Sequence, residues 1–231
     1  FLEALIDKCE VGFARKVHGL VAATPLIGQR FKSVCRRTAV INNFPKREEL
    51  QKAVAWGSRG NGICYIGAIS EHRGIFQLLK ALEYCDSTLH LAGSFSEKEV
   101  EYAARAMPGW KKVQFYGQVD REGLSSIYAK CKVGVINFLP EPNHVFSQPN
   151  KLFEYMANGI PVVGSDFTFW RQVLVDQECG FVVDPCSPVE IASRINFLLE
   201  NDKIAESMGH RGWLLASEKY NWESEEGKLF S

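Results

Sequence analysis

The 231-residue sequence lacks any apolar run long enough to cross a bilayer, and no signal peptide stands at its start. Its formal net charge is zero, so the overall charge gives no indication of a nucleic-acid partner. These absences favour a globular, cytoplasmic protein. Because the chain opens at Phe1 inside an amphipathic pattern, we expect the natural start to lie further upstream.

Motifs that define several large enzyme classes are also missing. No G-x-G-x-x-G follows a strand, which disfavours a nicotinamide-dinucleotide enzyme, and no P-loop of the form G-x-x-x-x-G-K-[ST] occurs. The G-x-S-x-G pattern of serine hydrolases is absent. Since there is no D-x-D pair, we expect no carboxylate-bound divalent ion bridging a diphosphate.

Cysteine and histidine are present, but their spacing indicates no metal site. The seven cysteines include no C-x-x-C pair, and the five histidines show no ligand spacing. Several cysteines lie inside apolar runs, so we expect buried, reduced thiols. The sequence therefore predicts neither a metal nor another cofactor.

Regular alternation of strand and helix patterns begins after residue 61. Strands are expected near 63–69, 87–93, 113–117, 132–138, 161–165 and 180–184. Helical spacing separates them, with a capping box predicted at Ser96 and Glu99 and an N-cap at Asp120. One further helix is expected over 203–220. This order predicts an α/β protein with a Rossmann-like, doubly wound parallel sheet.

Ligands of such sheets bind beyond the carboxyl ends of the strands, at helix N-termini. At the first specialised junction, Gly67 leaves a strand and Arg73 stands at the start of the next helix. A cation there does not help the helix itself, but it suits a bound anion such as a diphosphate. An exposed arginine in a turn is the alternative.

A second junction lies where the long loop 139–149 meets a predicted helix. Free backbone N–H groups at Asn150 and Lys151 would point at a phosphate, and the Lys151 ammonium would add charge. Glu154, one turn deeper, suits two vicinal ribose hydroxyls because a carboxylate accepts two hydrogen bonds at once. The alternative is a surface pair of Lys151 with Glu154.

The other candidates are single residues. A third junction, at Gly117, would let a flat base approach the backbone, with an ordinary turn as the alternative. His144 lies in the long loop that faces the expected cleft, with a solvated loop histidine as the alternative.

The run SQPNKLFEYMANGIPVVGSDF (147–167) resembles the C-terminal, donor-binding domain of group 1 retaining glycosyltransferases with the GT-B fold. YIGAISEHRGI (65–75) is similar to the first strand, loop and helix of that domain. GQVDREGLSSIYAKCKVGVI (117–136) is similar to its middle section. The resemblance covers about 62–225 and, more loosely, 1–45.

The resemblance implies roles for individual residues. Arg73 and Lys151 would neutralise the donor diphosphate and Glu154 would hold the ribose, as the catalytic set. Further substrate contacts would come from Gly67, Asn150, Gly117 and Val119. Two positions depart from the family: Ala68 and Phe146 stand where many members carry an arginine and a glutamate. Candidate substitutes for the sugar-facing contacts are Glu141 and His144.

The resemblance also divides the chain. The expected parts are a remnant of an N-terminal acceptor domain with the crossover (1–45), a linker (46–61), a nucleotide-sugar-binding domain (62–213) and a C-terminal helix packing back toward the N-terminal domain (214–231). Such a fragment is expected to bind donor but to turn over poorly, since closure of two domains normally builds the site.

The expected activity is transfer of a sugar from a nucleotide-diphosphate donor to an acceptor hydroxyl, with retention, in the synthesis of cell-surface polysaccharide or glycan. The expected partners are the nucleotide sugar and a glycan or lipid-linked acceptor, with peripheral contact at the inner membrane face and no nucleic acid. Two alternatives stay open: a non-catalytic nucleotide-binding or interaction module, and a GT-B-type nucleotide-sugar epimerase.

The membrane contact is suggested by local charge. Residues 1–52 hold ten Lys or Arg against five Asp or Glu. The basic residues that would face anionic lipid or a lipid-linked acceptor are Arg30, Lys32, Arg36 and Arg37. An ordinary solvated surface is the alternative.

Overall fold

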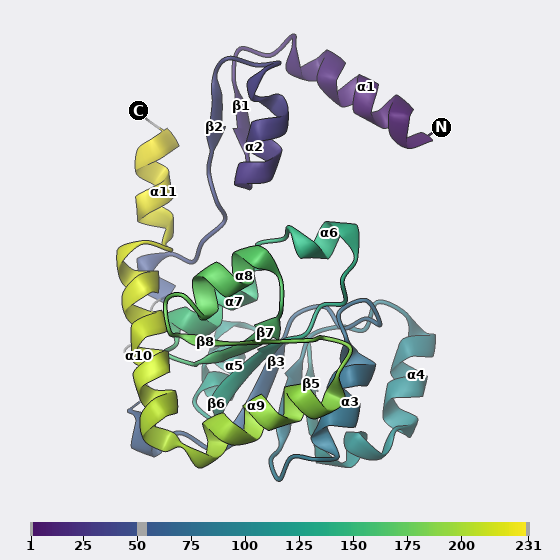
Figure 1. The fold of residues 1–231 in the computed structure, drawn as a ribbon, viewed down its shortest axis with the longest axis vertical. Helices are drawn as coiled ribbons and strands as arrows, with labels where there is room; N and C mark the ends of the chain where they lie inside the picture. Colours follow the sequence, from purple (N-terminus) through teal and green to yellow (C-terminus); the bar gives the residue numbers. More distant parts are fainter. Residues whose placement is uncertain (1, 50–54, 230–231) are drawn as a thin grey trace.

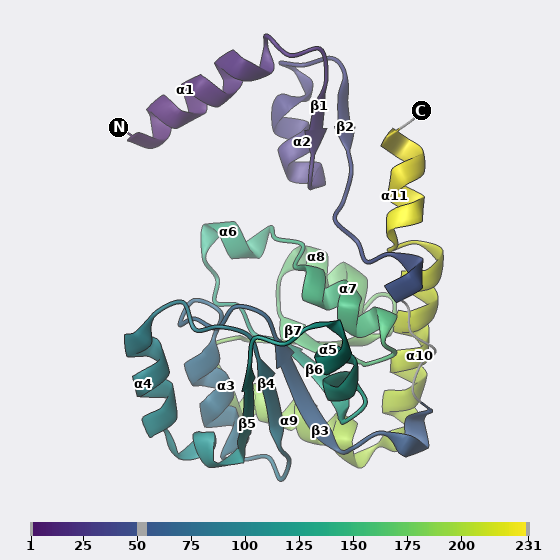
Figure 2. The same cartoon turned by 180° about the vertical axis from the view of Figure 1, so that it is seen from behind.

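The computed structural model describes residues 2–49 and 55–229, shown from opposite sides in Figures 1 and 2. Its N-terminal unit consists of α1 (Leu2–Ala14), β1 (Leu20–Ala22), α2 (Pro25–Lys32) and β2 (Thr38–Val40). The two strands pair in parallel. Gly28 brings α2 close to β2, because a Cβ there would stand 2.4 Å from Cγ2 of Val40. The unit is thus a small β-α-β motif.

The main sheet has six strands, all parallel, in the order β5-β4-β3-β6-β7-β8. Their bounds are β3 (Gly62–Ile66), β4 (Leu89–Ala92), β5 (Val113–Gly117), β6 (Cys131–Ile136), β7 (Val162–Ser165) and β8 (Gly180–Val183). The chain starts in the middle at β3, builds one side, and then crosses over to β6. This reversal leaves a crevice at the carboxyl ends of β3 and β6. The strand order confirms the predicted doubly wound sheet.

Helices cover both faces of this sheet (Figures 1 and 2). One face carries α3 (Ile75–Leu82), α4 (Lys98–Ala106) and α9 (Pro188–Glu200). The other face carries α5 (Arg121–Tyr128), α7 (Asn150–Ala157) and α8 (Thr168–Leu174), with α10 (Asp202–Glu218) packed outside α7. Each face has its own hydrophobic core. Because both faces are covered, all five residues of β3 are buried.

Two local predictions need correction, and a third is confirmed. The capping box at Ser96 and Glu99 is wrong, because α4 starts one residue later, at an N-cap Glu97 whose side chain makes no capping bond. The loop after β6 is not wholly irregular, since it contains the short helix α6 (Pro142–Val145). The N-cap at Asp120 is confirmed, because its side chain accepts a hydrogen bond from the Gly123 N–H.

The helix expected over 203–220 is confirmed as α10, and a further helix, α11 (Trp222–Leu229), follows it. Asn221, fully buried, separates them. Its Nδ2 donates to the carbonyls of Ala216 and Ser217, while its Oδ1 accepts from the Ser224 N–H. One side chain therefore ends α10 and begins α11.

Helix α11 is bonded to the segment that follows β2. The buried Glu225 carboxylate accepts from the backbone N–H and the side-chain amide of Asn42, at 2.9 and 3.1 Å. The Glu223 carboxylate accepts from the Arg47 N–H, and the Trp222 N–H donates to the Pro45 carbonyl. These bonds join the C-terminal helix to the segment that connects the two units.

The segment expected to be a linker is ordered where the structure describes it. It contains the short 3-10 helices η1 (Arg47–Glu49) and η2 (Trp56–Ser58), while 50–54 lie outside the described residues. After η2, the buried Arg59 guanidinium donates to the carbonyls of Tyr128, Cys131 and Asn158. Residue 59 is therefore part of the domain core.

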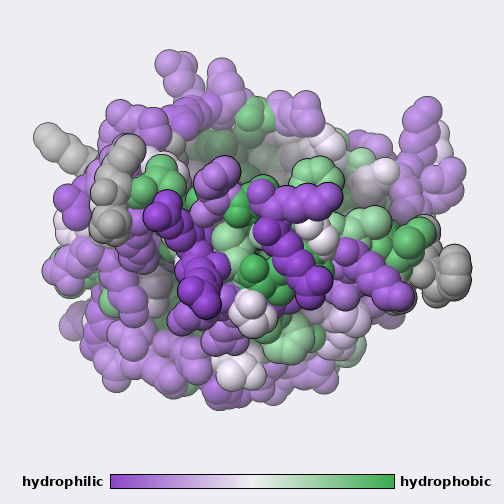
Figure 3. All heavy atoms as spheres, turned by 90° about the horizontal axis from the view of Figure 1, so that it is seen from above, coloured by the Kyte–Doolittle hydropathy of each residue, from purple (hydrophilic) through white to green (hydrophobic). Residues whose placement is uncertain are grey.

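The surface differs between the two units. The end of the molecule that carries the N-terminal unit exposes apolar side chains among hydrophilic ones (Figure 3). Those of the N-terminal unit are Leu5, Ile6, Phe13, Val17, Val21, Leu26 and Ile27.

All seven cysteines are free thiols; five are buried, as predicted, whereas Cys9 and Cys186 are exposed. Within 2–49 and 55–229, no helix combines the length and apolar character needed to span a membrane.

Candidate functional site

The carboxyl ends of β3, β4 and β5 meet in a floor made of glycines. Gly67 has φ 106° and Gly93 has φ 136°, backbone conformations that residues with a Cβ rarely adopt. A Cβ at Gly93 would stand 1.9 Å from the Gly67 carbonyl oxygen. The Gly93 N–H also donates to the Gly117 carbonyl at 2.7 Å. The three turns are thus packed backbone against backbone.

Two cations from different junctions meet at one aromatic ring. The Arg73 guanidinium carbon lies 5.3 Å from the centre of the Phe138 ring, and Nζ of Lys151 lies 5.2 Å from it. Phe138 follows β6, so the switch point of the sheet brings these groups together. The sequence analysis missed Phe138, although an aromatic residue directly after a buried strand is the kind of signal that could have identified it.

Lys151 is buried, with 7% of its surface exposed. Its ammonium lies 3.8 Å over the Tyr65 ring and has no hydrogen-bond partner among the described residues. Burial, with the nearby Arg73 charge, lowers the pKa of the Lys151 ammonium to about 7. The alternative of a surface pair with Glu154 is therefore wrong. A buried donor without an acceptor is costly, and a bound anion at this place would supply the acceptor.

Gly67 borders this ammonium. A Cβ at Gly67 would stand 3.8 Å from Cε and 3.9 Å from Nζ of Lys151, so the backbone of this glycine lies directly beside the ammonium. The loop from Gly67 to Arg73 is held by the Tyr65 hydroxyl, which donates to the carbonyls of Ala68 and Arg73 at 3.1 and 3.4 Å. The half-buried Arg73 side chain lies on this fixed loop.

Glu154 and Asn150 lie on α7 together with Lys151, and the Glu154 carboxylate is close enough to the ammonium to act on its pKa. Both line a hollow of about 320 Å³ together with Phe44 and Lys46. Glu154 also borders a second hollow, of about 260 Å³, and its Oε2 lies 3.5 Å from the Tyr128 hydroxyl. The carboxylate is thus half-buried and open to ligands on one side.

Gly117 and Val119 lie at the end of β5. Gly117 has φ 67° and borders an open groove of about 440 Å³ with Gly93 and Gln118. Val119 packs against the hydrophobic core next to Leu124. A planar ligand at this junction would therefore contact mainly backbone and an aliphatic side chain.

His144 belongs to α6, and Glu141 is the N-cap residue of that helix. Glu141 Oε1 lies 3.4 Å from Nδ1 of His72, the neighbour of Arg73. The His144 ring lies 4.7 Å from the Phe138 ring, and its Nδ1 is 3.2 Å from the Leu139 carbonyl oxygen. His144 is therefore partly buried against the ring that both cations touch. Phe146 is 60% exposed and contributes no polar group.

The structure thus brings Gly67, Arg73 and Lys151 together and places His144 beside them. Glu154 and Asn150 line a neighbouring hollow, and Gly117 with Val119 borders a third position along the same edge of the sheet. In the part of the chain that is described, no three His, Cys, Asp or Glu side chains are grouped as metal ligands would be.

Comparison with known proteins identifies clear relatives. The family model described as "Glycosyl transferases group 1" matches residues 46–213. The D-rhamnosyltransferase WbpZ of Pseudomonas aeruginosa is 27% identical over 63% of this chain and 38% of its own length. A phosphatidyl-myo-inositol mannosyltransferase of Mycobacterium leprae is 29% identical over 71% of this chain and 43% of its own. The chain thus spans about two fifths of these relatives.

A solved structure shares the fold. Anabaena Alr3699/HepE in complex with UDP-glucose superposes with a TM-score of 0.75 at 18% identity. The match covers 97% of this chain and 66% of that one.

Proposed function

Because the chain belongs to the group 1 glycosyltransferases and its sheet is the Rossmann-like domain of the GT-B fold, we propose that it binds the nucleotide-sugar donor of a retaining glycosyltransferase. The observation that carries the proposal is the buried Lys151 ammonium, which lacks an acceptor and lies at the glycine floor beside Arg73. A diphosphate bound there would satisfy both cations at once.

In the proposed reaction, negative charge grows on the leaving diphosphate as the bond to the sugar breaks. Arg73, Lys151 and the N–H groups at the start of α7 stabilise that charge, and they do so without reorganising because aromatic packing and the fixed loop hold them in place. The acceptor proton passes to the leaving phosphate, and we assign no protein nucleophile. The residues that we propose as catalytic are Arg73, Lys151 and Glu154.

The rest of the donor is assigned along the same edge of the sheet. The ribose hydroxyls donate to the half-buried Glu154 carboxylate, which is open to the hollow that it shares with Asn150. The base lies at Gly117 and Val119. Gly67 lies beneath the diphosphate, and Glu141 and His144 approach the sugar from α6. No metal or other cofactor takes part in this proposal.

The substrate classes follow from the relatives. HepE is described in complexes with UDP and UDP-glucose, and the curated relatives are named as a D-rhamnosyltransferase and a phosphatidyl-myo-inositol mannosyltransferase. We therefore propose a nucleotide-diphosphate sugar as donor and a glycan or lipid-linked hydroxyl as acceptor, in cell-surface polysaccharide or glycan synthesis. No nucleic acid is part of this proposal.

We propose a cytoplasmic location, peripheral at the inner membrane face, on the basis of the N-terminal unit. Of its basic residues, Arg30 is paired with Asp7 and Glu10 of α1 and is thus partly neutralised. Lys32, Arg36 and Arg37 are exposed, close in sequence to the exposed apolar Leu26 and Ile27. Such a mixed surface suits an anionic lipid interface.

Calorimetric titration with UDP, GDP and ADP tests the proposal. One nucleotide should bind, and Glu154→Ala or Lys151→Met should weaken it at least tenfold, about 1.4 kcal/mol. Lys151→Met preserves the volume of the buried side chain, and Glu83→Ala, at an exposed carboxylate beyond α3, serves as a matched control that should change nothing. Absence of binding by all three at millimolar concentration would overturn the proposal.

The two alternatives have their own signatures. Conversion of the donor sugar in the absence of any acceptor would favour an epimerase. Nucleotide binding with no transfer to any acceptor would favour a non-catalytic module. That alternative is supported by Ala68 and Phe146, which stand where many family members carry charged residues.

A further inference from the structure

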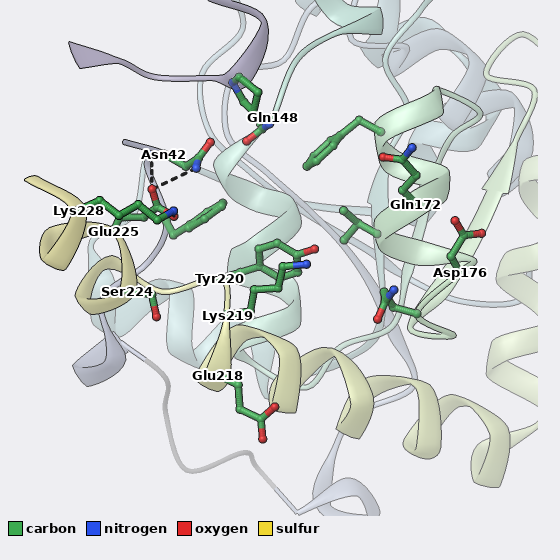
Figure 4. Close-up of a pocket in the computed structure, with 15 residues that line it drawn as sticks. Asn42, Gln148, Gln172, Asp176, Glu218, Lys219, Tyr220, Ser224, Glu225 and Lys228 are labelled. Atoms are coloured by element: carbon green, nitrogen blue, oxygen red, sulfur yellow. Dashed lines mark hydrogen bonds and ion pairs between the residues drawn. The ribbon is translucent and has the colours of Figure 1, made fainter. Parts of the chain in front are cut away.

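A pocket of about 560 Å³ lies outside the proposed donor site, between α8 and the junction of α10 with α11 (Figure 4). The segment after β2 closes it on the third side, with Asn42 and Phe44. In Figure 4, Gln172 and Asp176 of α8 lie on one side of the pocket, and Ser224, Glu225 and Lys228 of α11 lie on the other. Its volume falls within the range of small-molecule sites, about 300–1,000 Å³.

The polar lining of this pocket combines carboxamides with charged side chains. Four carboxamide side chains line it, those of Asn42, Gln148, Gln172 and Gln177. A carboxamide both donates and accepts hydrogen bonds, so it matches a hydroxyl group, which does the same. Oδ1 of Asn42 is buried without a hydrogen-bond partner in the described part of the chain. A hydroxyl donor at this wall is the kind of group that this oxygen lacks.

Aromatic rings provide the apolar lining, from Phe44, Phe169 and Tyr220. Phe44 and Tyr220 pack edge to face, with ring centres 5.4 Å apart. Rings that border an otherwise polar pocket offer flat apolar surface to the C–H face of a sugar, while its hydroxyls reach the amides.

The charge of the pocket argues against a phosphate. Glu225 is neutralised by Lys228 at 2.6 Å. The remaining charged lining residues are two carboxylates, Asp176 and Glu218, against one ammonium, Lys219. No arginine lines the pocket, in contrast to the donor site. A nucleotide or sugar phosphate would meet a net negative wall, whereas a neutral polyhydroxylated ligand would not.

The pocket adjoins the proposed donor site. Phe44 lines both this pocket and the hollow that holds Asn150 and Glu154. Gln148 stands two residues before Asn150, and the indole N–H of Trp170 in α8 donates to the Ser147 carbonyl at 2.8 Å. The loop before α7 is thus a shared wall, fixed to α8, with the donor site on one side and the amide pocket on the other.

We propose that this pocket binds a neutral sugar unit of the acceptor glycan, next to the unit that receives the transferred sugar. The assignment of this sugar to the acceptor rests on the proposed function; the sugar site itself rests on the amides, rings and charge of the pocket. The same features set it apart from the donor site, which is cationic and takes a diphosphate.

Saturation-transfer NMR on the full 231-residue chain tests this proposal, with methyl α-D-mannopyranoside, methyl α-L-rhamnopyranoside and methyl α-D-glucopyranoside as probes. At least one of the three should bind, and UDP, GDP and ADP should not displace it. Gln172 and Gln177 are exposed, so the double change Gln172→Ala/Gln177→Ala leaves the core intact. It should weaken sugar binding at least fivefold. The matched control, Gln114→Ala on the edge strand β5, should not weaken it.

Three outcomes would separate this inference from the proposed function. Nucleotide binding with no signal from any of the three sugars would overturn the pocket and leave the donor site standing. Displacement of the sugar by nucleotide, or its loss in Glu154→Ala, would place the sugar in the donor site and also overturn the pocket. Sugar binding that depends on Gln172 and Gln177, with no nucleotide binding, would support the pocket and overturn the donor assignment.

Discussion

The cationic site around Lys151 and the amide pocket beside α8 share one wall but differ in almost every physical property. The first is built from a buried ammonium, a guanidinium and aromatic rings over a glycine floor. The second is lined by four amides together with charged side chains and aromatic rings, and the two glutamines on α8 and in the turn after it are exposed. The contrast suggests that burial selects the ligand: a buried charge needs an opposite charge, whereas exposed amides suit neutral hydroxyls.

The largest effect should come from Gly93 in the glycine floor, with Gly227 near the amide pocket as the contrasting glycine. Gly93→Ala forces a Cβ to within 1.9 Å of the Gly67 carbonyl oxygen at a φ of 136°. We expect a loss of about 3 kcal/mol or more in the free energy of unfolding, measured by urea denaturation. Gly227→Ala, in α11 near the amide pocket, has nothing within 4 Å and should be neutral or stabilising. Equal stability of the two variants would contradict the packed floor.

A lysine in each region gives the next contrast. Lys151→Met removes a buried, unpartnered ammonium, so it should raise the free energy of unfolding by about 1–4 kcal/mol while weakening nucleotide binding at least tenfold. Lys219→Met, in the amide pocket, should change nucleotide affinity less than about twofold. Thermal denaturation and calorimetry on the same samples measure both effects. A Lys151→Met protein that is less stable and binds nucleotide normally would argue for a structural lysine.

The pH dependence should also differ between the two regions. The pKa of Lys151 is lowered to about 7, so the free site loses its proton above that pH, while a bound diphosphate would keep the lysine charged. Nucleotide affinity should therefore fall about fivefold between pH 7 and pH 8, and the proton uptake on binding should rise from about half a proton at pH 7 to about one at pH 8. The other groups near this ammonium are Arg73, Glu154 and Cys64. Neutral amides do not titrate, so sugar binding should be constant over this range.

Titration calorimetry in two buffers of different ionisation enthalpy measures the proton uptake directly.

The lowered pKa of Lys151 also makes the free energy of unfolding depend on pH. The unfolded chain holds this proton up to about pH 10.4 whereas the folded chain releases it near pH 7, so the ligand-free protein should gain stability as the pH rises from 7 to 10. Lys151→Met should lack that part of the gain. If both proteins respond to pH in the same way, the lysine is charged throughout.

The smallest effect is expected for the exposed glutamines. Gln177→Ala should alter the free energy of unfolding by less than about 0.5 kcal/mol, because the side chain is exposed and makes no hydrogen bond that stabilises the fold. A loss of more than 1 kcal/mol in denaturant unfolding would mean that the amides of this pocket serve the fold, and the contrast with the cationic site would weaken.

Much of the fold was predictable from residue patterns. The all-apolar strands, the Asp120 cap and the helix that begins at Asn150 all follow from local preferences, and the structure has each of them. Predictions that depended on exact helix ends were weaker. Ser96 was expected to cap α4, but the helix starts later, after Glu97, whose side chain makes no capping bond. Single-residue hydrogen bonds decide such boundaries, and periodicity does not register them.

The site was predictable in its residues but not in its environment. Gly67, Arg73 and Lys151 could be selected because each stands at a strand-to-helix junction, where ligands of such sheets bind. The ring of Phe138 that joins them, and the hollow that Glu154 shares with Phe44, arise from segments far apart in the chain. The amide pocket gave no sequence signal at all, because its four amides come from the segment after β2, the loop before α7, α8 and the turn that follows it.

By itself, the sequence determined the order of strands and helices and the cations that stand at their junctions, because these follow from local periodicity and from turn chemistry. Only the tertiary structure decided that Lys151 lies between Tyr65 and Phe138 rather than in solvent. The pKa of that lysine depends on which low-dielectric groups surround it, and the packing of distant segments sets those surroundings. The same packing turned four scattered amides into one pocket.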